Sequence, residues 1–392
     1  MIVSDEFSEF LQLHYYDLTK KEFTTITTDI PWDVEFITID KHGNKGAFSA
    51  NEGGLSKLYI LDLHTLKYRK VSDFPKGIIR DLKINPKGTQ VGFNFYSSTF
   101  QRKVYGYDIK KGTLNQYTRK GKPQTDSIKF TKSEKFTFKS IDPNTNEEYQ
   151  IPAFIYKSKK QNSPVFIDIH GGPEYQIRAF FNGFYQYLVD ELGITVIVPN
   201  IRGSNGYGKS YMKMDDGFNR ENAIEDIGAL LNWIERQDNL DSDHVAIFGE
   251  SYGGYVVLAS LAKYPDKLKC GIDAFGISNW ITYLKNTSDY RRDLRRVEFG
   301  DERNPEMRQY LKQISPVNNF GQITSPLLIF QGQNDPRVNW QEAQQMYEVL
   351  NSNEKEVWYV VAKDEGHGFY KNENYKLKRN LTISFLKRNL LE

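Results

Sequence analysis

A serine in a glycine-flanked pentapeptide is the first residue whose setting could do chemistry. Gly249-Glu250-Ser251-Tyr252-Gly253 stands between an apolar run (244–249) and a helix-forming run (253–265). A serine held on a sharp strand-to-helix turn has strained dihedral angles, and side chains two residues before or after it would clash. The pattern predicts Ser251 as a nucleophile. It also puts the backbone N–H of Tyr252 at a helix N-terminus, where it can stabilise an oxyanion.

A serine hydroxyl is a weak nucleophile and needs a general base. Of the six histidines, three lie in N-terminal repeats, one starts the strand before the serine, and His170 precedes Gly171-Gly172-Pro173. The remaining one, His367, stands in the loop KDEGHGF after the apolar run EVWYVVA. A loop after a late strand suits a base that must reach over the carboxyl edge of a sheet. We therefore predict His367 as the base.

The acid that orients this base should follow a strand between the serine and the histidine. The apolar run 326–332 ends at Gly332, and Asp335 comes next. Asp364 and Glu365 are rival acids, but their nearness to His367 in the sequence would not place them behind its ring. The order Ser251, Asp335, His367 is that of an α/β-hydrolase and not that of chymotrypsin or subtilisin.

A second oxyanion donor is expected in FIDIHGGPEYQ, which reads as a strand followed by His-Gly-Gly. The glycines allow the backbone to approach a substrate closely, and the N–H of Gly172 is the expected donor. His170 itself is expected to be a structural residue of this loop.

The elements that must position these residues form a second pattern. Short apolar runs bounded by turn signals read as strands buried on both faces, and helical stretches lie between them. An antiparallel hairpin is expected at 136–158. Strands alternating with helices predict a mostly parallel α/β sheet, with strands at 164–170, 195–200, 244–249, 270–276 and 326–332 and helices at 219–237, 253–265 and 340–353.

The first ~120 residues have a different, repeating pattern. Alternating residues, an aspartate, a turn and a second alternating run recur three times, with Asp17, Asp62 and Asp108 at equivalent places. Hairpins that repeat about every 45 residues predict β-propeller blades, with a sandwich as the alternative. About two and a half blades fit, so either the chain is the C-terminal part of a longer protein or something else covers the sheet edges. We expect domains at 1–125 (partial β-propeller) and 126–392 (α/β-hydrolase), with a polar linker at 120–134.

Composition excludes several classes of function. The 52 basic and 50 acidic residues give a net charge of +2 and no basic stripe, which argues against nucleic-acid binding. The sequence has no apolar run of ~18 residues and no signal-peptide pattern, so neither a membrane span nor secretion is expected. The single cysteine, Cys270, is expected in the core. A cytoplasmic location fits these features, and a homo-oligomer is compatible with them.

From about Asp29 to the C-terminus, the chain resembles the prolyl oligopeptidase family of serine peptidases. The resemblance rests on DIHGGPE (168–174), PNIRGSNGYG (199–208), GESYGGY (249–255), GQNDPRV (332–338) and DEGHGF (364–369). Within this family, the chain looks most similar to the acylaminoacyl-peptidase and dipeptidyl-aminopeptidase-like branch.

The resemblance implies an α/β-hydrolase domain preceded by a propeller that admits oligopeptides, and no metal or organic cofactor. It implies Ser251, Asp335 and His367 as the catalytic triad, with Gly172 and Tyr252 as oxyanion donors. Arg337 would hold a substrate backbone carbonyl, with a surface ion pair as the alternative. Family members carry seven or eight blades. Because only the last blades are visible here, size filtering and specificity for a substrate N-terminus are not carried over.

Three functions remain open from the sequence. The first is hydrolysis of short peptides through an acyl-enzyme. The second is an esterase or other acyl hydrolase on the same triad, which the serine motif cannot exclude. The third is an inactive truncated fragment that acts as a binding scaffold. Labelling by a fluorophosphonate separates the third from the others, and comparison of peptide and ester substrates separates the first two.

Overall fold

The computed structural model describes residues 1–118, 129–143 and 145–392. The expected domain boundary at 125/126 and most of the expected linker lie outside these residues. The chain forms two compact units. We call the first the blade unit; it comprises Met1–Ser133, Gln176–Tyr187 and Asn205–Met212. The second, the hydrolase unit, comprises Glu134–Tyr175, Leu188–Ser204 and Lys213–Glu392.

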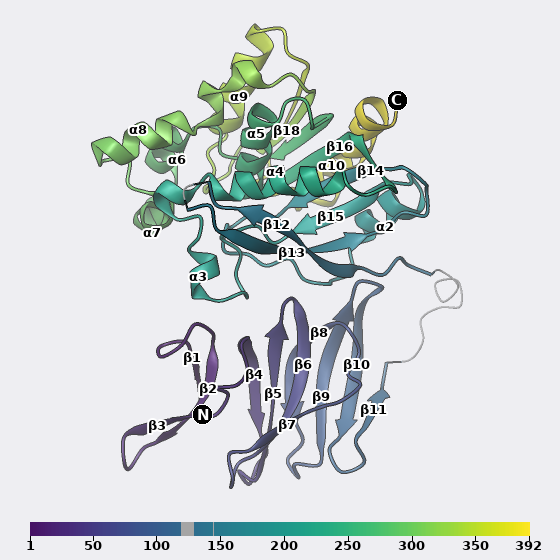
Figure 1. Cartoon of the computed structure of the whole chain (residues 1–392), viewed down its shortest axis with the longest axis vertical. Helices are drawn as coiled ribbons and strands as arrows, with labels where there is room; N and C mark the ends of the chain where they lie inside the picture. The colour runs from purple at the N-terminus through teal and green to yellow at the C-terminus, as the bar shows by residue number, and fades with distance from the viewer. Residues whose placement is uncertain (119–128, 144) are drawn as a thin grey trace. The chain divides into compact units, whose positions relative to one another are not determined.

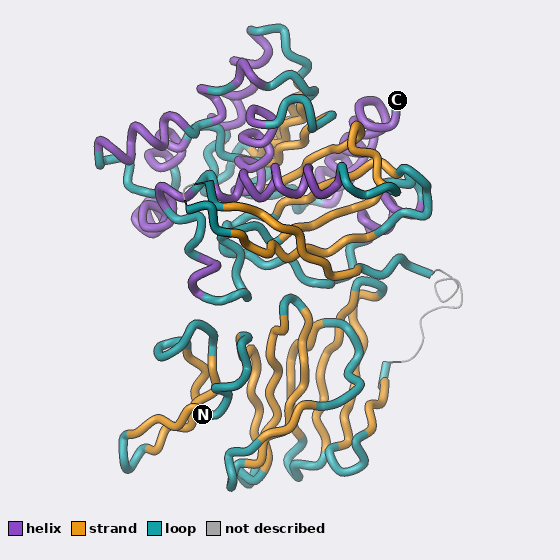
Figure 2. Tube along the Cα trace, in the orientation of Figure 1, coloured by secondary structure: helices purple, strands orange, loops and turns teal. Residues whose placement is uncertain are grey.

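The described residues of the blade unit form three antiparallel sheets (Figures 1 and 2). Each sheet is a meander in which consecutive strands pair, so the three recurring hairpins expected from the sequence are confirmed. One sheet has three strands and the other two have four. The strands are β1 (Ile2–Ser4), β2 (Gln12–Asp17) and β3 (Glu22–Thr25); β4 (Asp33–Ile39), β5 (Lys45–Glu52), β6 (Leu55–Asp62) and β7 (Tyr68–Lys70); and β8 (Ile78–Ile84), β9 (Gln90–Ser97), β10 (Phe100–Asp108) and β11 (Thr113–Gln116).

The recurring aspartates build the recurring turns. Each carboxylate accepts hydrogen bonds from the backbone N–H groups two and three residues later, at 2.8–3.2 Å, in the turns after Asp17, Asp62 and Asp108. This arrangement replaces backbone partners that the turn cannot supply, which explains why aspartate recurs there. The turn glycines Gly43 and Gly88 both adopt positive φ, at 70° and 66°.

Neighbouring sheets pack against each other through apolar side chains. One buried cluster joins β5 and β6 to β8 and β9, and includes Leu58, Ile79 and Phe95. A second joins the first sheet to the next one, with Leu13 against Val34 and Phe48. The blade unit therefore has a continuous core that runs between sheets, as stacked blades require.

The hydrolase unit is built on one eight-stranded sheet in the order β12-β13-β15-β14-β16-β17-β18-β19. The first two strands form the expected antiparallel hairpin, and β14 to β19 run parallel to one another. The strands are β12 (Glu134–Ile141), β13 (Glu148–Tyr156), β14 (Ser163–Ile169), β15 (Thr195–Pro199), β16 (Leu240–Glu250), β17 (Cys270–Ala274), β18 (Leu327–Gly332) and β19 (Val357–Ala362). Every residue of β15, β17 and β18 is buried, which explains their largely apolar sequences.

Helices follow the parallel strands, as expected from the sequence. Helices α4 and α5 contact each other and the sheet (Figure 1). The helices within the described residues are α2 (Gly183–Asp190), α3 (Lys209–Met212), α4 (Asn222–Ile234), α5 (Tyr252–Lys263), α6 (Trp280–Asn286), α7 (Asp289–Phe299), α8 (Pro305–Gln313), α9 (Gln341–Ser352) and α10 (Asn372–Leu386). Short helical turns lie at η1 (Gly217–Asn219), η2 (Pro316–Asn318), η3 (Phe320–Gln322) and η4 (Lys387–Leu391).

Local sequence explains where these helices form. In α4, the buried apolar residues Ile224, Ile227, Leu231 and Ile234 recur at helical spacing and form the face turned to the core. Nearly all of α5 is buried, which suits its apolar composition. Asparagine side chains cap the first turns of α6 and α8 by accepting backbone N–H bonds.

Candidate active site

Ser251 lies on a strained turn between β16 and α5. Its φ of 59° and ψ of −118° are unusual for a residue with a side chain. The flanking glycines are required by space: a Cβ on Gly249 would lie 2.2 Å from the carbonyl oxygen of Gly253, and one on Gly253 would lie 2.2 Å from that of Ile169. The expected clashes two residues on either side of the serine are therefore confirmed.

Asp335 and His367 form a hydrogen-bonded pair in the loops after β18 and β19. His367 Nδ1 lies 2.7 Å from Asp335 Oδ2. The other oxygen, Oδ1, accepts the backbone N–H groups of Arg337 (2.8 Å) and Val338 (3.0 Å). The Asp335 side chain is fully buried and that of His367 is 13% exposed. A carboxylate held in this way fixes the imidazole with its proton on Nδ1 and leaves Nε2 as the acceptor.

Ser251 and His367 contact neighbouring residues, Ala274 and Phe275, at the end of β17. The Ser251 N–H donates to the carbonyl of Ala274 at 2.9 Å, and the ring of Phe275 packs on the His367 imidazole with centroids 4.9 Å apart. Among the described residues, no hydrogen bond joins the Ser251 hydroxyl to the imidazole. Such contacts are often long in unbound enzymes and tighten when substrate binds.

The loop after β14 lies against the serine turn. A Cβ on Gly171 would stand 3.2 Å from Ser251 Cβ, and Gly172 has a φ of 127°. His170 is buried, with its ring nitrogens 2.9 Å from the Gly171 carbonyl oxygen and 2.8 Å from Ser204 Oγ. Burial lowers the pKa of His170 to about 4, so its ring is neutral at physiological pH. Its structural role is supported by these contacts.

The remaining predicted residues take two kinds of position. Tyr252 is the first residue of α5, so its N–H has no acceptor within the helix. Arg337 is exposed and its carbonyl oxygen accepts a hydrogen bond from Thr287 Oγ1 at 2.8 Å. Its guanidinium forms no ion pair with any described residue, and the choice between substrate binding and a surface ion pair stays a prediction.

The two rival acids have other partners. The Asp364 carboxylate is exposed and contacts Lys371 Nζ at 2.6 Å. Glu365 accepts the backbone N–H of Lys371 at 2.8 Å and the side-chain amide of Asn374 at 2.9 Å. These contacts tie the loop to the start of α10, and neither acid binds the imidazole.

A buried polar network behind Tyr252 was not predicted from the sequence. The Tyr252 hydroxyl donates to Asp215 Oδ2 at 2.8 Å, and the guanidinium of Arg220 pairs with Asp215 and with Glu298. The Asp215 and Arg220 side chains are fully buried. The stretch MDDGFNREN shows polar residues typical of a solvated loop. Nothing in one sequence signals that such charges are buried against each other.

A model of the prolyl oligopeptidase family matches residues 180–392. Dipeptidyl aminopeptidase BIII of Pseudoxanthomonas mexicana is 35% identical over 226 residues, which are 57% of this chain and 33% of that protein. Dipeptidyl peptidase family member 6 of Caenorhabditis elegans is 32% identical, over 56% of this chain and 30% of that protein. The chain thus spans about a third or less of the length of these relatives.

Solved structures share the fold over nearly the whole chain. An acylaminoacyl peptidase of Pyrococcus horikoshii superposes with a TM-score of 0.81 at 24% identity, over 97% of this chain and 59% of that one. A puromycin-hydrolyzing peptidase of Mycobacterium tuberculosis gives 0.83 at 20% identity, over 99% and 59%. The expected fold class, an α/β-hydrolase preceded by a partial β-propeller, is confirmed. By its family match over more than half its length, the chain belongs to the prolyl oligopeptidase family.

Proposed function

We propose that this chain is a serine peptidase that cleaves short peptides through an acyl-enzyme on Ser251. The observation that carries the proposal is the Asp335–His367 pair, 2.7 Å between Nδ1 and Oδ2, packed on the strand end that also binds the Ser251 N–H. Membership of a family whose relatives are named as peptidases supports peptide over ester substrates.

In the proposed reaction, Ser251 Oγ attacks the scissile carbonyl carbon while His367 Nε2 takes the hydroxyl proton. The N–H groups of Tyr252 and Gly172 donate to the oxyanion that forms. The tetrahedral intermediate collapses as the imidazolium returns the proton to the leaving amine, which leaves an ester on Ser251. Water then attacks this ester with the same base, and the acid product and free Ser251 are released.

Asp335 and Arg337 have supporting roles in this proposal. Asp335 fixes the imidazole tautomer and stabilises the positive charge that develops on the ring. Arg337 offers an exposed guanidinium two residues after Asp335, and it would hold a backbone carbonyl of the peptide. A role in binding predicts that Arg337→Met raises KM for peptides more than it changes kcat.

A fluorophosphonate probe tests the nucleophile. We expect wild-type protein to label stoichiometrically and Ser251→Ala not to label. Ser260→Ala is the matched control, because Ser260 is buried on the same helix and should leave labelling unchanged. Absence of labelling in folded wild-type protein, or equal labelling of Ser251→Ala, would overturn the proposal.

The substrate class is tested with matched leaving groups. For each substrate, kcat/KM is divided by the rate of its uncatalysed hydrolysis. We expect this ratio to be higher for chromogenic peptide amides than for the corresponding simple ester. If protein that the fluorophosphonate labels hydrolyses esters but no peptide amide, the same triad belongs to an esterase instead. Blocked and free-amine versions of one peptide then show which N-terminus is preferred.

A further inference from the structure

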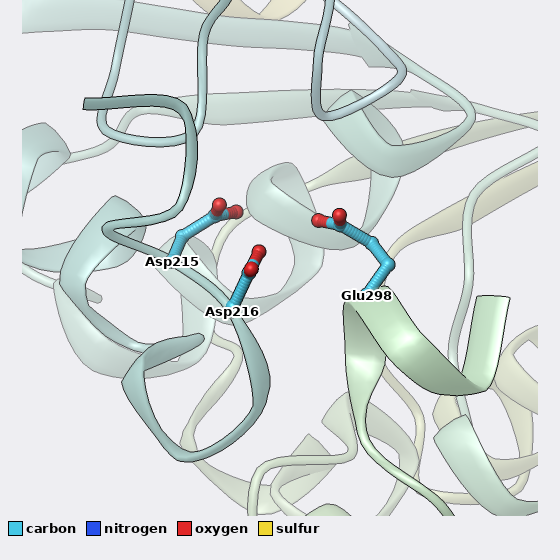
Figure 3. Close-up of side chains that lie close together, drawn as sticks. All are labelled: Asp215, Asp216 and Glu298. Carbon is cyan, nitrogen blue, oxygen red and sulfur yellow. The ribbon is translucent and has the colours of Figure 1, made fainter. Parts of the chain in front are cut away.

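Two groups of charged side chains adjoin the serine turn. The first holds three carboxylates whose oxygens lie within 4.8 Å of one another, and Figure 3 shows them converging: Asp215, Asp216 and Glu298. The second is the ion pair between Lys378 of α10 and Glu250 of β16. This pair contacts residues on both sides of the proposed proton transfer, next to Ser251 and next to His367, and the proposed mechanism gives it no role.

Lys378 carries a buried ammonium group. Its side chain is 7% exposed, and its Nζ pairs with the Glu250 carboxylate. The ammonium also lies over three phenylalanine rings, with 5.2 to 6.0 Å between Nζ and the ring centroids: Phe248, Phe275 and Phe369. Moving an ammonium from water into a protein interior is costly, and an apolar side chain of similar length would pack there without that cost. The charge at this position therefore needs a reason other than packing.

One contact of the ammonium leads to the nucleophile. Glu250 is the last residue of β16 and directly precedes Ser251. Its side chain is 47% exposed, so without a partner it would be free to turn into solvent. Burial raises the pKa of the Glu250 carboxyl, but the charge of Lys378 and its hydrogen bond to this carboxyl lower the pKa, and the net shift is downward. Glu250 is therefore ionised at neutral pH and stays paired with Lys378, which fixes one side of the strained serine turn.

A second contact of the ammonium leads to the base. The ring of Phe275 lies 5.2 Å from Nζ and packs on the His367 imidazole, with 4.9 Å between the ring centroids. Phe275 has a φ of 47°, in the left-handed region that residues with a side chain rarely adopt, and its N–H donates to the Phe330 carbonyl oxygen at 2.7 Å. A strained backbone persists only where its surroundings hold it. The attraction between the ammonium and the ring is one of the contacts that hold Phe275 against the imidazole.

The two contacts meet at the step that the proposed reaction depends on. Proton transfer from Ser251 to His367 requires their side chains to reach hydrogen-bond distance. The Lys378 ammonium binds Glu250, which precedes the serine, and Phe275, which packs on the imidazole. Because one cation attracts both the carboxylate and the ring, it limits how far the nucleophile and the base can move apart.

We propose that Lys378 is a positioning residue for the acyl transfer on Ser251. It acts through Glu250 and Phe275, which set the distance between the nucleophile and His367. This inference rests on the proposed function and adds a residue of α10 to its machinery. The competing explanation is a purely structural role, in which Lys378 attaches α10 to β16 and has no effect on turnover.

The variant Lys378→Met keeps the length and apolar bulk of the side chain and removes its charge. Turnover is expressed per site that the fluorophosphonate labels at completion, so that loss of folded enzyme cancels. We expect kcat to fall about 10–10²-fold while KM changes less than about threefold, because the geometry of proton transfer is disturbed and substrate binding is not. Lys376→Met is the matched control and should keep the wild-type kcat, because Lys376 is an exposed lysine of the same helix paired with Glu373 at 3.1 Å.

Glu250→Gln tests the same contact from the other side. The Glu250 side chain is half-exposed, and glutamine has its shape, so the variant should fold. An amide holds the ammonium less strongly than a carboxylate does, and kcat should fall severalfold. Since both single variants weaken one contact, the combined variant should lose less than the product of the two single losses.

Several results would overturn the positioning role of Lys378. A lower melting temperature of Lys378→Met with the kcat of wild-type protein would show that the role is structural. A rise in KM with unchanged kcat would show a role in substrate binding instead. If Lys378→Met yields no folded protein, a wild-type kcat in Glu250→Gln has the same consequence, as do losses that multiply in the combined variant. Absence of both labelling and turnover in wild-type protein overturns the proposed function itself, and this inference with it.

Discussion

At the scale of single residues, Asp335 is held independently of its histidine. Two backbone N–H groups, from Arg337 and Val338, bind one carboxylate oxygen and leave the other free to face the imidazole. The tight turn that follows β18 supplies both donors. Because the orientation of the carboxylate is fixed by the backbone, an amide at this position would be held in the same place but would present the wrong hydrogen-bonding groups to His367.

The variant Asp335→Asn therefore separates chemistry from folding. We expect kcat/KM to fall by about 10³–10⁴, because the imidazole loses both its tautomer preference and the charge that stabilises its protonated form. Thermal unfolding should change little. Asp364→Asn is the control, since this exposed rival acid should leave turnover unchanged. Similar losses in the two variants would contradict the assignment of Asp335.

Asp273 is a second acid whose setting is unusual. It lies on β17, fully buried, and a Cβ on either Gly254 or Gly276 would come within 2.3 Å of its Oδ1. Neither oxygen has a partner of good hydrogen-bond geometry among the described residues. Burial raises its pKa to about 7, which the nearby N–H of Gly276 only partly offsets. The folded protein therefore binds a proton that the unfolded chain releases near pH 4.

This difference predicts how stability depends on pH. Between about pH 4 and pH 7, Asp273 is protonated in the folded state and ionised in the unfolded state, so its contribution to the free energy of unfolding falls by about 1.4 kcal/mol per pH unit as pH rises. Below pH 4 the contribution is fully present. Urea unfolding at several pH values should show that Asp273→Asn lacks this slope. The exposed Asp243→Asn should keep it, and parallel curves for wild type and Asp273→Asn would contradict the prediction.

At the scale of elements, the serine turn depends on how closely α5 approaches β14. Gly253 in the first turn of the helix contacts the carbonyl oxygens of Ile169 and His170 at the strand end, where a Cβ would lie 2.2 and 2.9 Å away. Backbone atoms cannot yield as a flexible side chain can. The same approach places the loop with Gly171 beside Ser251.

Gly253→Ala should therefore move α5 away from the end of β14. We expect a loss of about 2–3 kcal/mol in unfolding free energy, measured by urea denaturation, together with slower labelling of Ser251. Gly321→Ala is the control, because a Cβ on Gly321 meets nothing within 4 Å and should change stability by less than about 0.5 kcal/mol. Equal stability of the two variants would show that α5 can shift without cost.

The order of elements could be predicted from the sequence because each carries its own local signal. Apolar runs mark the parallel strands, and aspartate turns mark the hairpins. The positions of Ser251, Asp335 and His367 follow, since each stands just after a strand. Burial of charge could not be predicted in this way. Asp215 and Arg220 lie in a polar loop, and only tertiary packing against Tyr252 and α7 removes them from solvent.

At the scale of the whole molecule, the blade unit is not a simple N-terminal segment. Gln176–Tyr187 and Asn205–Met212 come from the later part of the chain and belong to it. Arg178 shows what they contribute. Its guanidinium pairs with Glu35 on β4 and also donates to Ser56 Oγ at 3.0 Å and to the Gly54 carbonyl at 3.4 Å. The sheet formed by β4 to β7 is thus contacted by a residue that the sequence places more than a hundred positions away.

The contribution of Arg178 can be measured with Arg178→Met. The Arg178 and Glu35 side chains are 6% and 17% exposed, so removing the cation leaves a largely buried carboxylate without its partner, which should cost about 3 kcal/mol. Urea unfolding should show this loss of stability. Hydrogen-exchange mass spectrometry of the folded variant should show faster exchange in β4 to β6. Lys139→Met removes one charge from an ion pair that is 66% and 58% exposed, and should cost less than about 0.5 kcal/mol. Equal losses in the two variants, or unchanged exchange in β4 to β6, would mean that the blade unit is stable without this later segment.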